Sequence, residues 1–141
     1  MNNPLLRIDG LKTYFHTEDG TVRAVDGVSL AVERGKTLGI VGESGSGKSV
    51  MAYSILRLLP ESVADIKEGA VEWIGEKGRV DLVKLPIEEM PHYRGGDIAM
   101  IFQEPMTSLN PVFKCGKQVA ESIVYHKGAS WEEAWKRGTE L

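Results

Sequence analysis

The sequence predicts an α/β fold, and three features of the chain lead to this prediction. Residues 5–15 and 22–32 alternate between apolar and polar side chains and predict two strands near the N-terminus. Residues 36–41 form a short apolar run between glycines, which is typical of a buried central strand. A glycine-rich loop at 42–47 then leads into residues 48–59, which have the length and composition of a helix and stop before a proline.

Further elements are predicted along the rest of the chain. We expect a loop at 61–69, followed by short strands at 70–74 and 80–85 and a short helix at 86–93. A further strand is expected at 97–103, and two helices at 115–125 and from residue 130 onward. Ser130 and Glu133 form a capping box, in which the serine oxygen accepts from a backbone N–H of the first turn. Trp131 and Trp135 share one face of that helix, where either packing or contact with a partner suits them. Gly138 is the one stop signal near the end, so we expect the chain to be cut within a longer domain.

Composition restricts the class of protein. The 141 residues suffice for one domain but not for two. Seventeen Lys and Arg against twenty Asp and Glu give a net charge of −3, which argues against a protein that coats nucleic acid. The single cysteine, Cys115, cannot form an internal disulfide. The chain has neither a signal-peptide pattern nor an apolar run of about 18 residues, so we expect a cytoplasmic protein.

The strongest motif lies at 42–49, where Gly-Glu-Ser-Gly-Ser-Gly-Lys-Ser matches G-x-x-x-x-G-K-[ST]. Its glycines let successive backbone N–H groups point into one concavity, and the following helix directs its positive end to the same place. Lys48 would reach the β- and γ-phosphates, and the Ser49 hydroxyl would face Mg²⁺. The predicted nucleotide-binding residues are Gly42, Glu43, Ser44, Gly45, Ser46, Gly47, Lys48 and Ser49. The motif alone leaves kinase, GTPase, helicase and transporter ATPase open.

A second motif narrows this choice. Residues 101–111 read Ile-Phe-Gln-Glu-Pro-Met-Thr-Ser-Leu-Asn-Pro. With this segment the chain resembles the ATPases of ATP-binding-cassette (ABC) transporters, and among them those of oligopeptide and dipeptide importers, a group with nickel-type relatives. The stretches that carry the resemblance cover nearly the whole chain: 11–17, 24–49, 94–112 and 118–126.

The resemblance implies an ABC-type P-loop NTPase fold with an N-terminal antiparallel β part. Residues 1–103 would hold this β part and the P-loop core, and residues 104–141 would hold the Q-loop and the start of a helical subdomain. Gln103 would be the Q-loop glutamine, which contacts Mg²⁺ and the attacking water, and it would share the catalytic work with Lys48. Phe15 would stack on the adenine, with Tyr14 as the second choice.

The function implied by the resemblance is ATP-powered import of a small solute, with peptides as the first choice. The implied partners are membrane-spanning permease subunits, a second ATPase subunit and, indirectly, a solute-binding protein. The chain itself would be a peripheral protein at the cytoplasmic face of the cell membrane. The family also uses an LSGGQ-like signature, a catalytic Asp-Glu pair after an apolar strand and a switch histidine, and the 141 residues contain none of them. We therefore expect the chain to bind ATP and Mg²⁺ but to lack residues needed for complete hydrolysis.

Other interpretations stay open at this point. Residues 99–104 resemble an apolar strand followed by a carboxylate pair, but Gln103 in place of the first Asp is a poorer magnesium ligand. A P-loop kinase or GTPase would explain 42–49 and leave the 101–111 match as coincidence. A nucleotide-binding fragment without catalysis is compatible with every feature of the sequence.

Overall fold

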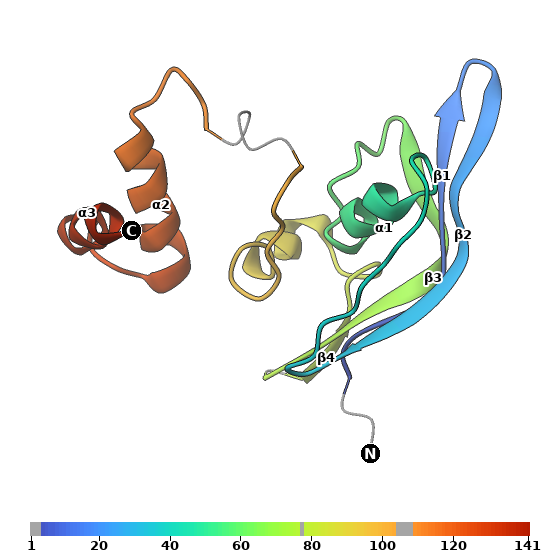
Figure 1. Ribbon diagram of the computed structural model, residues 1–141, viewed down its shortest axis with the longest axis horizontal. Coiled ribbons are helices and arrows are strands. Elements are labelled where there is room, and N and C mark those ends of the chain that lie inside the picture. The colour runs from blue at the N-terminus through green and yellow to red at the C-terminus, as the bar shows by residue number, and fades with distance from the viewer. Residues whose placement is uncertain (1–3, 77, 104–108) are drawn as a thin grey trace. The chain divides into compact units, whose positions relative to one another are not determined.

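The computed structural model describes residues 4–76, 78–103 and 109–141. The chain divides into two compact units, one ending at His92 and one beginning at Tyr93. The first unit contains a four-stranded antiparallel sheet and helix α1 (Lys48–Ile55), and the second contains helices α2 (Cys115–Lys127) and α3 (Trp131–Glu140) (Figure 1). The boundary that the sequence predicts between 103 and 104 concerns subdomains of the family and stays a prediction.

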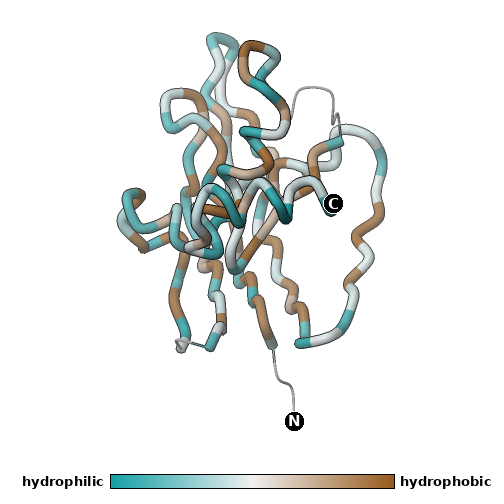
Figure 2. Tube along the Cα trace, turned by 90° about the vertical axis from the view of Figure 1, so that its left-hand side faces the viewer, coloured by the Kyte–Doolittle hydropathy of each residue, from teal (hydrophilic) through white to brown (hydrophobic). Residues whose placement is uncertain are grey.

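The sheet has the strand order β2-β1-β3-β4. Its strands are β1 (Pro4–Thr17), β2 (Gly20–Glu33), β3 (Ala64–Gly75) and β4 (Gly78–Asp81). The two strands expected at 5–15 and 22–32 are thus confirmed, and a tight turn joins them. Apolar and polar residues follow each other along these strands (Figure 2), as expected for a sheet with one buried face.

The central strand β1 contains a bulge that disturbs its alternation. Ile8, Leu11 and Thr13 are all buried, although the first two are three residues apart. The pairing with β2 shifts register between Ile8 and Leu11, and the Gly10 N–H donates to Ser29 Oγ at 2.8 Å. Beyond the bulge, Ala64 to Glu68 of β3 continue to pair with β1. The prediction of a loop at 61–69 is therefore wrong from residue 64 onward, where β3 begins.

A turn after β4 shortens the strand that the sequence predicts at 80–85. Asp81 Oδ1 accepts hydrogen bonds from the N–H groups of Val71 and Val83, at 3.3 and 3.1 Å. A 3-10 helix, Ile87–His92, then occupies the place of the helix predicted at 86–93.

Helix α1 is attached to the inner face of the sheet by a buried pair of hydroxyl groups. Thr13 Oγ1 and Ser54 Oγ lie 2.9 Å apart, and Ser54 Oγ donates to the carbonyl oxygen of Val50. The helix ends earlier than the predicted 48–59, because Arg57 takes a left-handed conformation with φ of +50°. The Leu58 N–H then donates to Tyr53 O at 2.9 Å, which closes the end of the helix.

Two predicted strands are absent from the described part of the chain. Residues 36–41 and 97–103 are irregular, and the one bridge near the second segment pairs Arg94 with Ile98. Val41 and Ile101 are 94% and 96% exposed. An apolar run becomes a buried strand only where other strands pair with it, and among residues 4–76, 78–103 and 109–141 no strand pairs with either segment.

The second unit is a helical hairpin. Ala120 of α2 and Ala134 of α3 are both fully buried, and such small side chains allow two helices to approach closely. The Glu133 N–H donates to Ser130 Oγ at 3.2 Å, which confirms the predicted helix start. The Trp135 ring packs against Gly116, where a Cβ atom would lie 2.6 Å from the ring. Among the described helices, none is long and apolar enough to cross a membrane.

Candidate functional site

The glycine-rich loop is pressed against the backbone of β2. Gly47, the residue before α1, has φ of +86°. A Cβ atom on Gly47 would lie 2.1 Å from the carbonyl oxygen of Ala24, so only glycine fits here without displacing the loop. The start of α1 is therefore set by direct contact between the loop and the sheet.

The ammonium group of Lys48 closes the loop on itself. Its Nζ donates to the carbonyl oxygens of Gly42 and Glu43, both at 2.7 Å, and to Ser46 Oγ at 3.0 Å. An ammonium group has three N–H donors, so all of them are used within the loop. A phosphate that binds here would exchange these acceptors for its own oxygens.

The N-terminal end of α1 is suited to an anion. No side chain caps this end, and the first turn contains no acidic residue. Ser49 lies in this turn and is exposed, so its hydroxyl is accessible beside Lys48. A cavity of about 290 Å³ adjoins the loop. It lies between β2, the segment 36–41 and α1, and its lining includes Val25, Ile40, Val41, Gly47 and Lys48.

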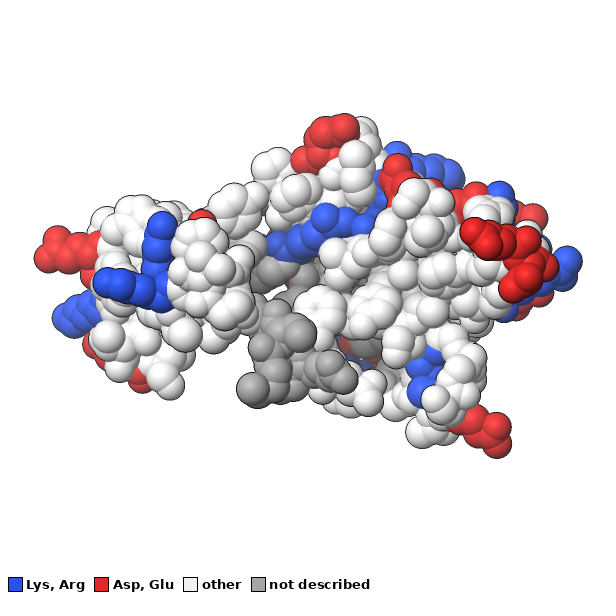
Figure 3. All heavy atoms as spheres, turned by 90° about the horizontal axis from the view of Figure 1, so that it is seen from above, with Lys and Arg blue, Asp and Glu red and all other residues white. Residues whose placement is uncertain are grey.

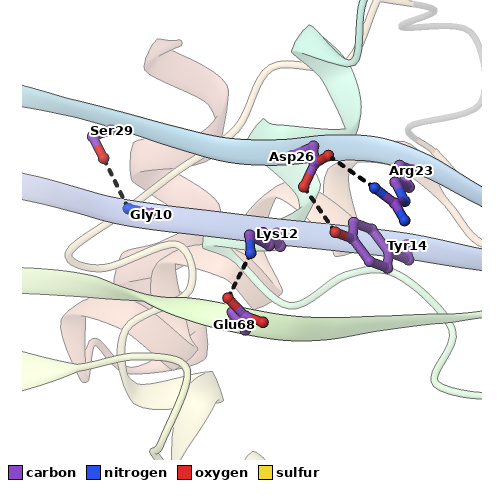
Figure 4. Close-up of polar contacts among 7 residues, drawn as sticks. All are labelled: Gly10, Lys12, Tyr14, Arg23, Asp26, Ser29 and Glu68. Atoms are coloured by element: carbon purple, nitrogen blue, oxygen red, sulfur yellow. Dashed lines mark hydrogen bonds and ion pairs between the residues drawn. The ribbon is translucent and has the colours of Figure 1, made fainter.

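The sheet separates the two aromatic residues considered for adenine. The Tyr14 hydroxyl donates to Asp26 Oδ1 at 2.7 Å, and the Arg23 guanidinium lies 5.6 Å from the centre of the Tyr14 ring. Figure 4 shows Tyr14 on the same side of β1 as Lys12, which pairs with Glu68 at 2.6 Å. The hydrogen bond to Asp26 raises the pKa of the Tyr14 phenol above its usual value.

Phe15 belongs to the opposite face of β1. Successive residues of a strand point to opposite faces, and the pairing of Thr13, Tyr14 and Phe15 with β3 is regular. Thr13 faces α1 through its contact with Ser54, so Phe15, two residues further on, shares the face on which α1 packs. Stacking of Phe15 on adenine stays a prediction, but the fold places this residue rather than Tyr14 on the side of α1.

The remaining predicted site residue, Gln103, belongs to the second unit and is exposed at the end of an irregular segment. Glu104 and the rest of 104–108 lie outside the described residues. Within the described ranges, no group of three or more His, Cys, Asp or Glu side chains could hold a metal ion. On the face drawn in Figure 3, acidic and basic side chains are interspersed over the sheet unit.

The structure also shows an interaction of the Gln118 side chain. The side-chain amide of Gln118 on α2 bonds to the backbone of Asn110 and Phe113. Gln118 lies in the stretch that resembles the ABC family, but no pattern in the sequence indicates where its amide turns.

Comparison with known proteins gives a consistent picture. Residues 25–139 match the family described as ABC transporter. A protein of Brucella abortus named as a peptide import ATP-binding protein is 47% identical over 139 residues, which are 98% of this chain and 41% of the relative. A glutathione import ATP-binding protein of Salmonella typhimurium is 52% identical over 132 residues, or 92% of this chain and 21% of the relative. The chain thus spans less than half the length of these relatives.

Solved structures give the same fold. A dimeric structure of a bacterial ABC transporter cassette has a TM-score of 0.78 and 26% identity, and the match covers 96% of this chain and 54% of the cassette chain. A second cassette structure, in a post-hydrolysis state bound to ADP and Pi, has a TM-score of 0.74 and 24% identity, which bears on the fold alone. The predicted fold class, including its antiparallel β part, is confirmed.

We expect Gly47→Ala to destabilise the chain more than Gly45→Ala does. Both glycines have positive φ, so both substitutions carry the cost of a left-handed alanine, about 1–2 kcal/mol. Only the alanine at 47 also collides with the Ala24 carbonyl, since a Cβ at Gly45 meets nothing within 4 Å. Urea denaturation of both variants measures the free energy of unfolding. Equal losses would show that the contact with β2 does not position the loop.

We expect Phe15→Ala to weaken ATP binding by about 1–3 kcal/mol, the usual contribution of a base stacked on an aromatic ring. Phe15→Tyr keeps the ring and should bind ATP nearly as well. Tyr14→Phe removes only the hydroxyl that bonds to Asp26 and should leave ATP affinity unchanged. Titration with ATP by calorimetry compares these three variants and a fourth, Tyr14→Ala. A loss confined to Tyr14→Ala, with Phe15→Ala normal, would transfer the role to Tyr14.

Proposed function

We propose that this chain, which belongs to the ABC transporter family, is the nucleotide-binding part of an ATPase subunit. The subunit would power the import of a solute. The observation that carries this proposal is the position of the loop 42–49. Gly47 holds the loop against β2, and the loop leads directly into the uncapped N-terminal end of α1. The relatives named as peptide and glutathione import ATP-binding proteins support a peptide-like solute. Membrane-spanning permease subunits would then be the partners, and the chain would bind them as a peripheral protein at the cytoplasmic face of the cell membrane.

A second ATPase subunit belongs to the same proposal. The cassette structure that this chain matches at a TM-score of 0.78 is described as dimeric. We infer that the complete protein pairs in a similar way, with either an identical or a related subunit.

In the proposed complex, the phosphates of ATP replace the contacts that Lys48 makes within the loop. The lysine gives up two carbonyl oxygens and one hydroxyl and gains charged phosphate oxygens. Hydrogen bonds between charged partners are stronger than those to neutral acceptors, so the exchange favours the nucleotide. The backbone N–H groups at the start of α1 add further donors.

Mg²⁺ would accompany the ATP. The ion commonly binds through one or two protein oxygens, the phosphates and several waters, so it does not need a cluster of carboxylates. The accessible Ser49 hydroxyl in the first turn of α1 fits this requirement. When bound, Mg²⁺ neutralises phosphate charge. A contribution from Gln103 stays a prediction.

We infer further that these 141 residues bind ATP without turning it over. Phosphoryl transfer depends on groups that position the water and stabilise charge. The sequence contains the phosphate loop and Gln103, but it contains no signature segment, catalytic Asp-Glu pair or switch histidine of the family type.

We expect Lys48→Ala to weaken binding of Mg-ATP at least tenfold, or about 1.4 kcal/mol, in a calorimetric titration. Lys84→Ala is the matched control, because Lys84 is an exposed lysine of the same unit whose pair, Asp81, lies outside the loop. Phosphate release should stay at background in the purified unmodified chain and in both variants. Unchanged affinity in Lys48→Ala would contradict the phosphate site. Steady phosphate release that disappears in Lys48→Ala would contradict the absence of turnover.

We expect Lys48→Ala, introduced into the complete ATPase subunit that contains these residues, to reduce uptake of a labelled tripeptide by the cells. The reason is that import requires ATP binding by the subunit. Uptake of labelled glutathione, measured in parallel, distinguishes a glutathione importer, which takes up glutathione alone, from a general peptide importer, which takes up both solutes. Normal uptake of both solutes, in cells whose variant subunit binds no ATP, would rule out peptide import as the function.

A further inference from the structure

We propose that the carboxylate of Glu43 makes the loop 42–49 discriminate against ATP that carries no Mg²⁺. The side chain places a negative charge beside the phosphates, and metal-free phosphates are repelled more strongly than phosphates neutralised by Mg²⁺. This inference rests on the proposed function, since it assumes that ATP binds at the loop. It adds which ionic form of the nucleotide the site accepts, and which residue makes that choice.

The backbone of Glu43 lies inside the loop, directly beside the ammonium group of Lys48. The Glu43 carbonyl oxygen accepts from Lys48 Nζ at 2.7 Å and from the Ser46 N–H at 3.3 Å. Bond lengths limit a glutamate carboxylate to about 5 Å from its own Cα. The carboxylate therefore lies within about 10 Å of the Lys48 ammonium, which is the group expected to hold the phosphates.

The charge of Glu43 is not neutralised by a neighbouring cation. The residue is exposed, and the described part of the chain includes no lysine, arginine or histidine that pairs with its carboxylate. Lys48 itself uses its three N–H donors on two carbonyl oxygens and a hydroxyl. At an ionic strength of about 0.1 M, screening takes effect over about 10 Å, so the carboxylate acts on a phosphate bound at Lys48.

Glu43 is also the sole carboxylate that the loop and its surroundings turn toward this position. Among residues 34–60, it is the one acidic residue. Asp26 lines the cavity beside the loop, but its carboxylate bonds to Tyr14 and pairs with Arg23 on the far face of the sheet (Figure 4). A single substitution can therefore remove the negative charge from the site.

The strength of the repulsion depends on the charge of the nucleotide. Metal-free ATP carries about four negative charges near neutral pH, and bound Mg²⁺ reduces this to about two. Lys48 and the N–H groups at the start of α1 attract the more highly charged form more strongly, so on their own they would favour metal-free ATP. The carboxylate of Glu43 offsets this preference, because it repels the metal-free form about twice as strongly.

The test is a calorimetric titration with ATP, in the presence of either Mg²⁺ or EDTA, at an ionic strength of about 0.05 M. Glu43→Gln keeps the size of the side chain and removes its charge, whereas Glu43→Asp keeps the charge. The control is Glu88→Gln, which removes an exposed carboxylate of the same unit from the 3-10 helix, outside the loop.

We expect Glu43→Gln to bind metal-free ATP about fourfold more tightly than the parent chain, and Mg-ATP about twofold more tightly. Glu43→Asp and Glu88→Gln should bind both forms as the parent does. At an ionic strength of about 1 M both gains should disappear, because screening then acts within about 3 Å. Urea denaturation should give the same free energy of unfolding for Glu43→Gln and the parent, since the side chain is exposed.

Three results would overturn the inference. The first is a Glu43→Gln variant that binds metal-free ATP no better than the parent. The second is an equal gain with and without Mg²⁺, or a gain that persists at high salt, since either would indicate a changed loop shape rather than a removed charge. The third is a Glu43→Asp variant that behaves like Glu43→Gln. Failure of both the parent and Glu43→Gln to bind ATP in either form would instead contradict the proposed function.

Discussion

The close contact between Gly47 and the carbonyl oxygen of Ala24 determines how the first unit is arranged. Because the loop meets the backbone of β2 directly, helix α1 begins at a fixed place on the sheet. The buried hydroxyl pair of Thr13 and Ser54 then holds the body of the helix to β1. The N-terminal end of α1, where the phosphate loop is predicted, is thus positioned by these two contacts with the sheet.

Local charge, rather than the charge of the whole chain, makes this site attractive to an anion. The chain carries a net charge of −3, yet the loop presents a lysine and the N-terminal end of a helix without an acidic residue in its first turn. The Lys48 ammonium group is hydrogen-bonded within the loop, because Gly42, Glu43 and Ser46 provide acceptors for it. The loop therefore has a satisfied state without nucleotide and a more strongly charged set of acceptors available with it.

The sequence predicted best those features that depend on neighbouring residues. The strands at the N-terminus, the start of α1 and the Ser130 cap follow from alternation, glycine spacing and capping chemistry. The prediction of strands at the apolar runs 36–41 and 97–103 is wrong, because the pairing of a strand depends on partners that a local sequence pattern does not contain. Only the contact of Thr13 with Ser54 shows that Phe15, rather than Tyr14, shares the face of β1 on which α1 packs. The hydrogen bonds of Gln118 likewise depend on the fold of the turn at Asn110.

The exposed segment 36–41 has a consequence for the life of the protein in a cell. Leu38, Ile40 and Val41 lie on an extended stretch whose backbone groups join no strand of the described sheet. Apolar, unpaired segments of this kind associate with one another when protein concentration is high, and molecular chaperones counteract that association. We therefore expect that covering this stretch, by other protein or by a chaperone, lowers the tendency of the chain to associate with other copies.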